Sequence, residues 1–352
     1  MSKLTACLKV ATLLGAGLAA FLSQPNSAAA FDRNQAQLFG VLPAGSTLPE
    51  GLAVAPNGDV YVATFDGSRT IVVFNQNGKY LRTLTVNAAS AGGFLGIAFH
   101  PTTGAFLVID FGAGTVLNVD KNTGTSSVFM TSPNGPAPAS GLNALEFDAQ
   151  GNVYVSDSFG GIIWRTGPHG GAVTNWAHDD RLKTAGDPPF GANGMGFNKA
   201  HSILFVANTG NDTILQIPVT NGNDGLTAGA VGIFTNSING ADGLIVDDQD
   251  NLWVCANQSD EIVVVDKTGK VIAKLGDFEG LVDGGTPKGL LFPASPAFSR
   301  DKKTVYVTNL ALDLRVGTQN PDNIAVDSGW AARVKHWTVS KIDTRFQPLP
   351  NK

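Results

Sequence analysis

Four oxygen-bearing side chains occupy the same place in four similar segments and are the residues best suited to do chemistry. They are Glu50, Asn143, Asn193 and Asp242, each followed by Gly or Ala and then by a short apolar run. Asn and Asp are common at such points because their side chains cap local turns. Glutamate is a poor local cap, so capping does not explain Glu50, and we expect the four to share one site.

The chemistry available to such a set is the binding of a hard cation. Two carboxylates and two amide carbonyls offer only oxygen and carry a formal charge of −2. Ca²⁺ takes six to eight oxygen ligands in irregular geometry. Zn²⁺ prefers His or Cys, which are absent from this register, and Mg²⁺ is less suitable because it keeps more of its waters. The residue types therefore favour one Ca²⁺.

The segments that must position these residues form a repeat of about fifty residues, with copies starting at positions 50, 95, 143, 193, 242 and 295. Each copy reads as strand, polar turn, strand, Asx/Gly corner and strand, followed by a variable fourth strand. Six copies predict an all-β, six-bladed β-propeller with four-stranded antiparallel blades around a central channel. A solenoid would need polar capping repeats, which we do not find. The first residues of the copies (Glu50, Leu95, Asn143, Asn193, Asp242 and Ser295) should lie nearest the channel.

The ends of the chain indicate export and closure of the propeller. Residues 1–30 carry Lys3 and Lys9, an apolar stretch and a run of alanines ending at Ala30, which is typical of a cleaved secretory signal. We expect residues 31–352 to form one domain, periplasmic or secreted after cleavage near Ala30. Residues 36–42 and 332–342 are expected to pair and close the last blade.

Composition narrows the class of partner. Loss of the two lysines in the signal changes the formal net charge from −5 to −7, and no Lys/Arg block occurs, which argues against nucleic acid. No later stretch is apolar enough to span a membrane. Cys255 is the one cysteine after the signal, so no internal disulfide is expected. We expect a monomer that acts on a small molecule.

At this point the sequence resembles the SMP-30/gluconolactonase/LRE-like family and its relatives, the paraoxonases and the diisopropylfluorophosphatase-type hydrolases. That resemblance implies a six-bladed propeller with a catalytic Ca²⁺ in its central tunnel. The family's Glu of the first blade, Asn of the third and fourth blades and Asp of the fifth fall on Glu50, Asn143, Asn193 and Asp242. The resemblance also implies that Asn143 is closer to a substrate contact than to a firm ligand.

The sequence departs from the family pattern at two positions. The Glu-x-Pro-x-Trp pattern is replaced here by "EGLAV" from Glu50. Ser295 stands where diisopropylfluorophosphatase-type enzymes have a histidine associated with a second calcium, so a second ion is not expected.

The expected activity is hydrolysis of a lactone or related ester, with Asp242 as the catalytic residue, acting either as general base, which we favour, or as nucleophile. Two interpretations of the loop 177–190 stay open: it covers the channel mouth and brings Arg181 or Phe190 to the substrate, or it is a solvated surface loop. Residues 311–331 could add to such a lid. Two alternatives stay open. One is a non-catalytic NHL-like propeller that binds a protein or small ligand, and the other is a lyase or strictosidine-synthase-like enzyme on the same scaffold.

Overall fold

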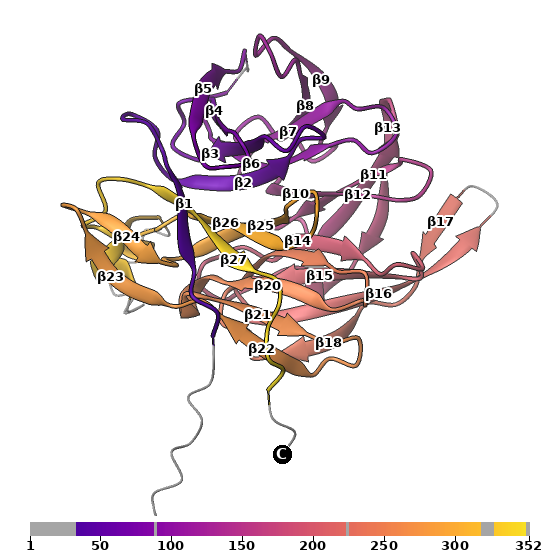
Figure 1. Cartoon of the computed structure of the whole chain (residues 1–352). Helices are drawn as coiled ribbons and strands as arrows, with labels where there is room; N and C mark the ends of the chain where they lie inside the picture. The colour runs from indigo at the N-terminus through magenta and orange to yellow at the C-terminus, as the bar shows by residue number, and fades with distance from the viewer. Residues whose placement is uncertain (1–32, 88–89, 223–224, 318–326, 350–352) are drawn as a thin grey trace, which may run out of the picture. The chain divides into compact units, whose positions relative to one another are not determined.

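A computed structural model describes residues 33–87, 90–222, 225–317 and 327–349. Arg33–Lys352 forms one compact unit, built almost entirely from small antiparallel sheets that follow one another as the six blades of a β-propeller (Figure 1). The predicted fold class is confirmed. The expected signal peptide, residues 1–30, lies outside the described residues.

Each blade is a sheet of four strands in sequence order, apart from blade 6. Blade 1 contains β2 (Pro49–Val54), β3 (Val60–Thr64), β4 (Thr70–Phe74) and β5 (Tyr80–Thr85). Blade 2 contains β6 (Phe94–Phe99), β7 (Phe106–Asp110), β8 (Thr115–Val119) and β9 (Ser126–Thr131). Blade 3 contains β10 (Leu142–Phe147), β11 (Val153–Asp157), β12 (Ile162–Gly167) and β13 (Gly170–His178). Blade 4 contains β14 (Ala192–Phe197), β15 (Ile203–Asn208), β16 (Thr213–Gly222) and β18 (Gly232–Asn236). Blade 5 contains β19 (Ala241–Val246), β20 (Leu252–Ala256), β21 (Glu261–Val265) and β22 (Val271–Leu275). Blade 6 contains β25 (Pro293–Phe298), β26 (Thr304–Asn309), β27 (Thr338–Asp343) and β1 (Gln37–Val41).

A few elements stand outside this plan. The strand β17 (Gly225–Ala228) extends β16 as a hairpin, and β23 (Phe278–Val282) pairs with β24 (Thr286–Gly289) between blades 5 and 6. The helical segments are short: η1 (Asp180–Leu182), η2 (Asn257–Ser259), α1 (Leu314–Gly317) and α2 (Ser328–Ala331). Within the described part of the chain, no helix is long and apolar enough to cross a membrane.

The propeller closes where the sequence predicted. β1 pairs antiparallel with β27, and Gln37 lies opposite Lys341, so the first strand of the chain becomes the outermost strand of blade 6 (Figure 1). The second partner begins later than expected, because residues 332–337, between the end of α2 and the start of β27, form a turn and irregular chain. Phe39 and Leu42 are buried against Val339 in the cluster between blades 6 and 1.

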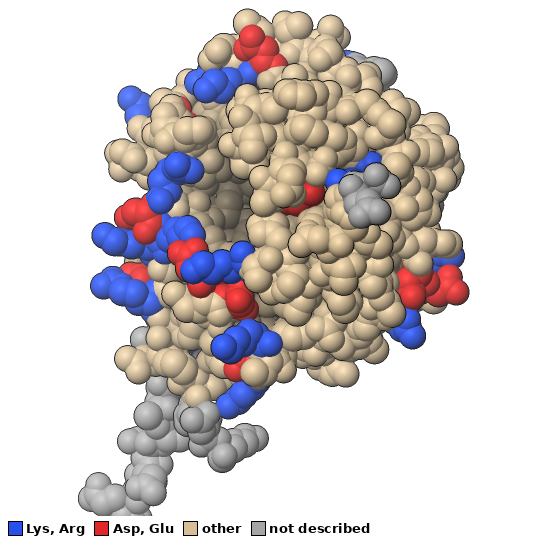
Figure 2. All heavy atoms as spheres, turned by 90° about the vertical axis from the view of Figure 1, so that its right-hand side faces the viewer, with Lys and Arg blue, Asp and Glu red and all other residues tan. Residues whose placement is uncertain are grey.

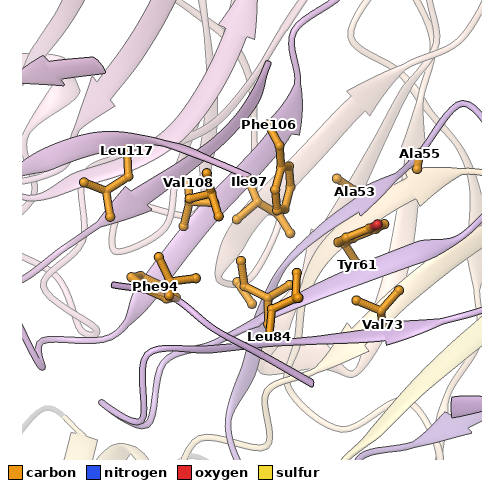
Figure 3. Close-up of a cluster of buried hydrophobic side chains, with 14 residues drawn as sticks. Ala53, Ala55, Tyr61, Val73, Leu84, Phe94, Ile97, Phe106, Val108 and Leu117 are labelled. Carbon is orange, nitrogen blue, oxygen red and sulfur yellow. The ribbon is translucent and has the colours of Figure 1, made fainter. Parts of the chain in front are cut away.

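The hydrophobic core is divided among the six boundaries between blades. Figure 3 shows the cluster between blades 1 and 2, where Tyr61 and Val73 of one blade meet Phe106 and Leu117 of the next. Each blade is covered on both faces, so a central strand such as β3, with the sequence VYVAT, is buried at every position. The outer strand β5, with one covered edge, is mostly exposed or half-buried. This packing explains the short continuous apolar runs in the sequence.

Every innermost strand carries a β-bulge at the channel. In β2, Glu50 and Gly51 together oppose one residue of β3, because the pairing Pro49↔Thr64 is followed by Leu52↔Val62. The same register shift occurs in the inner strands of all the other blades. A bulge bends its strand and re-aims the side chains of the extra residues. The second residue of each inner strand is therefore the channel residue.

This register corrects the sequence-based alignment of blade 6. The inner strand β25 begins at Pro293, so Ala294 stands in the channel register and Ser295 takes the position after it. The six channel residues are Glu50, Leu95, Asn143, Asn193, Asp242 and Ala294. The alignment was wrong by one residue because the polar Ser295 was matched to the polar residues of the other copies.

Glycine after the channel residue lets the inner strands approach closely. A Cβ on Gly51 would lie 2.1 Å from the carbonyl oxygen of Leu95 in the next blade, and one on Gly96 would lie 2.5 Å from that of Asn143. A Cβ on Gly194 would lie 2.6 Å from the carbonyl oxygen of Asp242, and one on Gly243 would lie 2.5 Å from that of Ala294. Because glycine has no side chain, neighbouring inner strands can lie close together around the channel.

On the face shown in Figure 2, charged side chains of both signs are interspersed and most of the surface is uncharged. A hollow opens on this face beside a mixed group of acidic and basic side chains.

Candidate metal centre in the channel

The four residues singled out in the sequence line one small cavity of about 40 Å³ at the channel axis. Glu50, Asn143, Asn193 and Asp242 are each about 95% buried. They come from the bulges of β2, β10, β14 and β19. The other described residues of the lining are Phe65, Leu95, Pro188, Phe190, Thr209, Asn257, Phe292, Leu310 and Leu312.

Glu50 is held by its backbone and leaves a carboxylate oxygen unpaired. Its carbonyl accepts a 2.8 Å hydrogen bond from the hydroxyl of Thr308 in blade 6. Its Oε2 is buried without a hydrogen-bond partner. Burial, and then the neighbouring charge of Asp242, raise the pKa of Glu50 well above its usual value. A buried acceptor beside a second carboxyl group is the environment that a cation would stabilise.

Asp242 is oriented by two amides. Asn257 donates from Nδ2 to Oδ2 of Asp242 at 3.1 Å, and Asn193 also donates a hydrogen bond to this carboxylate. Burial raises the pKa of Asp242 to about 7, while these two hydrogen bonds act in the opposite direction. Cys255 lies opposite the bulge of Asp242 in β20, and burial, with the charges of Asp242 and Glu50, raises the pKa of its thiol.

Asn193, which donates to Asp242, is also tied to Thr209 through its Nδ2. Nδ2 donates to the hydroxyl of Thr209 at 2.9 Å, and that hydroxyl donates to the carbonyl of Ala241 at 2.9 Å. The relay therefore joins blade 4 to the strand that carries Asp242. Ser158 makes the equivalent contact one blade earlier, donating to the carbonyl of Ala192 at 2.6 Å.

The two predicted substrate contacts in the loop 177–190 have different positions. Phe190 lines the cavity together with Pro188. Arg181 is not among the described lining residues: its guanidinium pairs with Asp179 at 3.1 Å and donates to the carbonyl of Val231 at 3.1 Å. Arg181 lies in η1, whereas Gly191 and Gly210 anchor the end of the loop beside Phe190 through backbone hydrogen bonds. Of the residues 311–331, Leu312 reaches the cavity and 318–326 lie outside the described residues.

The residues present fit a hard divalent cation. The orphaned Oε2 of Glu50, the carboxylate of Asp242 and the amide oxygens of Asn193 and Asn143 are all oxygen donors. No Lys, Arg or His lies among the described lining residues, so nothing else there compensates the carboxylates. Among the described residues no three His, Cys, Asp or Glu side chains cluster as a metal site.

Thr209 and Asn257 are site residues that the sequence analysis did not select. Both directly follow the second strand of a blade, where Asn208-Thr209 was interpreted as part of a turn. The signal was present in the repeat: the same position holds Phe65, Ser158 and Leu310 in other blades, so it faces the channel mouth.

A second, larger cavity of about 610 Å³ is lined by the residues after the channel ring, Gly96, Ala144, Gly194, Gly243 and Ser295 among them. Glu146, on the fifth position of β10, also lines it. Burial raises the pKa of Glu146 to about 8, against the hydrogen bonds donated by the backbone of Phe147 and Phe197.

The fold and the site together define a six-bladed propeller with an oxygen-lined cavity on its axis. Residues 86–276 match the model of the SMP-30/Gluconolactonase/LRE-like region, and the chain belongs to this family. The resemblance seen in the sequence is thereby confirmed, and membership supports an enzyme of the lactonase type. No curated protein matches the chain in a sequence search.

Solved structures of the same fold include proteins of different chemistry. A gluconolactonase of Xanthomonas campestris is 16% identical with a TM-score of 0.58, over 75% of this chain and 84% of its own. A calcium-binding protein, regucalcin of Agrobacterium tumefaciens, is 16% identical with a TM-score of 0.60, over 92% and 99%. The virginiamycin B lyase of Staphylococcus aureus is 15% identical with a TM-score of 0.52, over 75% and 78%. At these identities the likeness shows the fold alone.

Proposed function

We propose that the protein is a calcium-dependent hydrolase of lactones or related esters, with one ion held by Glu50, Asn193 and Asp242. The observation that carries the proposal is the unpaired, buried Oε2 of Glu50 in the same small cavity as Asp242. A bound Ca²⁺ would supply a Lewis acid that stabilises the negative charge developing on the substrate's carbonyl oxygen. Mg²⁺ is the less suitable ion, because a cage of protein oxygens leaves it few waters.

The side chains of the protein carry out proton transfer and hold the substrate and the carboxylate of Asp242. Asp242 accepts a proton from the attacking water, whose oxygen bonds to the carbonyl carbon. The ring C–O bond breaks, and the released oxygen takes up that proton to give a hydroxy acid. Asn257 holds the carboxylate of Asp242 in place, and Asn143 lines the same cavity, where it contacts the substrate.

The test is hydrolysis of a small lactone by calcium-loaded and chelator-treated protein. Chelation should abolish the activity, and re-addition of Ca²⁺ should restore it. Asp242→Asn should lower kcat by about 10²-fold or more, the usual contribution of a general base. The matched control is Asp180→Asn, because Asp180 is 93% exposed at the surface. Full activity in chelator-treated protein or in the Asp242 variant would overturn the proposal.

A single turnover in ¹⁸O-labelled water separates general base from nucleophile. With Asp242 as general base, the label enters the hydroxy acid and none appears in the enzyme. Label in the carboxylate of Asp242 would instead identify it as the nucleophile.

A lyase is the second candidate, because virginiamycin B lyase shares the fold. A catalytically inactive variant of that enzyme carries alanine in place of a histidine. No histidine lies among the described residues that line the axial cavity here, which favours hydrolysis. Ring opening without incorporation of water, detected by mass spectrometry, would support the lyase.

Export remains part of the proposal and rests on the sequence of residues 1–30. The mature N-terminus should begin near Phe31 in the periplasm or medium, as N-terminal sequencing of the recovered protein would establish. Recovery of intact protein from the cytoplasm alone would contradict export.

A further inference from the structure

Seven of the described residues that line the axial cavity are apolar. Leu95, Phe292 and Leu310 are nearly fully buried, and Phe65, Pro188, Phe190 and Leu312 are the others. Three of the polar lining residues are already hydrogen-bonded within the protein. Asn257 donates to Asp242, and Thr209 bridges Asn193 to the carbonyl of Ala241. The cavity therefore has few hydrogen-bonding groups left for a substrate.

Two of the apolar lining residues, Phe65 and Phe190, belong to a cluster of four phenylalanines. Phe65 contacts Phe111 at a ring-centroid distance of 5.5 Å, and Phe111 contacts Phe159 at 5.8 Å and Phe190 at 6.1 Å. Phe159 and Phe190 are 5.5 Å apart. All four side chains are partly exposed. Apolar surface of this kind around a cavity marks a place where an apolar ligand group binds.

We propose, resting on the proposed lactonase function, that the site takes uncharged lactones or esters with an apolar alkyl or aryl substituent and rejects polyhydroxylated sugar lactones. The cavity of about 40 Å³ has room for the reacting carbonyl group, so the substituent lies along the phenylalanine cluster. Each methylene buried there strengthens binding about 4-fold. A sugar hydroxyl placed against Phe65, Phe190 and Leu312 finds no partner, which weakens binding about 5- to 100-fold.

The kinetic test compares δ-decalactone, δ-valerolactone and glucono-δ-lactone with calcium-loaded enzyme, each rate divided by its spontaneous rate. We expect kcat/KM for δ-decalactone to exceed that for δ-valerolactone at least 10-fold and glucono-δ-lactone to be the poorest substrate. Phe190→Ser should remove most of the preference for the long chain and leave δ-valerolactone nearly unchanged, and Phe190→Leu should restore it. Val128→Ser is the matched control, because Val128 is an exposed apolar residue on the outer strand β9. Glucono-δ-lactone as the best substrate would overturn the inference and leave the lactonase function standing.

A binding test separates this inference from the hydrolytic function. Cyclohexanone and 2-pentylcyclohexanone cannot be hydrolysed, and calorimetry on the calcium-loaded protein measures their affinity. The pentyl compound should bind at least 10-fold more tightly, and Phe190→Ser should abolish that difference. If this holds while no lactone is hydrolysed, the apolar site stands and the proposed reaction fails. Equal binding of the two ketones would contradict the apolar site whatever the activity.

Discussion

Glu50 and Asp242 are two buried carboxyl groups in one cavity, and the described lining offers them no basic side chain. Ionising both in the absence of a cation is unfavourable, because burial raises both pKa values and the charge of Asp242 raises that of Glu50 further. A divalent cation reverses this balance, since it attracts the ionised form of each. Neutralising Glu50 should therefore stabilise the metal-free protein and remove the stabilisation that the metal gives.

Glu50→Gln should raise the melting temperature of chelator-treated protein at pH 8, because a buried charge is removed at nearly constant volume. The same variant should lose the stabilisation that Ca²⁺ gives the wild type, which is about 2.7 kcal/mol at a concentration 100 times Kd. Differential scanning fluorimetry with and without Ca²⁺ measures both effects, with Asp180→Asn as control. An unchanged calcium shift in Glu50→Gln would show that Glu50 is no ligand.

Glu146 predicts a pH dependence that belongs to the second cavity. Its pKa is about 8 in the folded protein, above the value of 4.5 for an unperturbed glutamate, so the folded state binds more protons between these values. The contribution of Glu146 to stability is therefore complete below about pH 4.5 and is lost as the pH rises toward 8. Glu146→Gln should flatten this decline by about 1 kcal/mol or more.

Urea unfolding at pH 5 and pH 8, in saturating Ca²⁺ to keep the axial carboxylates ionised, measures the effect. An equal loss of unfolding free energy from pH 5 to pH 8 in wild type and Glu146→Gln would contradict the attribution of this pH dependence to Glu146. A uniform loss of stability at both pH values would instead reveal only a packing role.

At the scale of the element, the bulge and the glycine after it bring the channel residues together. The bulges turn the side chains of Glu50, Asn143, Asn193 and Asp242 toward the cavity. The glycines allow a carbonyl group of one inner strand to lie close to the Cα atom of its neighbour. The backbone of one blade thereby sets the position of the channel residue in the next.

Gly51→Ala should destabilise the protein by about 2 kcal/mol or more and weaken Ca²⁺ binding, because its Cβ would lie 2.1 Å from the carbonyl oxygen of Leu95. Gly329→Ala is the matched control: among the described residues, no atom outside its own helix and its chain neighbours lies within 4 Å of a Cβ built there, and its place in α2 favours alanine. Denaturant unfolding and calcium titration compare the two. Equal stability of both variants would show that the inner strands can separate without cost.

At the scale of the whole propeller, β1 links the beginning of the described chain to its end. Ala36, Phe39 and Leu42 are buried between the last and first blades or beside them, so their removal exposes the cores of both. A chain of residues 33–352 should melt cooperatively at the temperature of the full-length protein. A chain of residues 43–352 should lose about 5 kcal/mol or more, from two or three large apolar side chains. Circular dichroism melting curves compare them, and equal curves would contradict closure by β1.

Much of this architecture was predictable, because strand pattern and repeat length are local and recur six times. The shared cavity followed from four polar residues in one register. Ala294 was missed because β25 offers no polar residue at that position. Arg181 was expected at the cavity but is not among its described lining residues, because the sequence does not reveal its pairing with Asp179. The apolar lining residues of the cavity come from separate blades and loops, so they leave no pattern in any one segment.

The account rests on one cation held in the axial cavity, and a calorimetric titration of chelator-treated protein with Ca²⁺ tests it most directly. We predict one Ca²⁺ per chain for the wild type and for Asp180→Asn, and no saturable binding for Glu50→Gln or Asp242→Asn. Absence of binding by the wild type, or an unchanged isotherm in both site variants, would contradict the central claim.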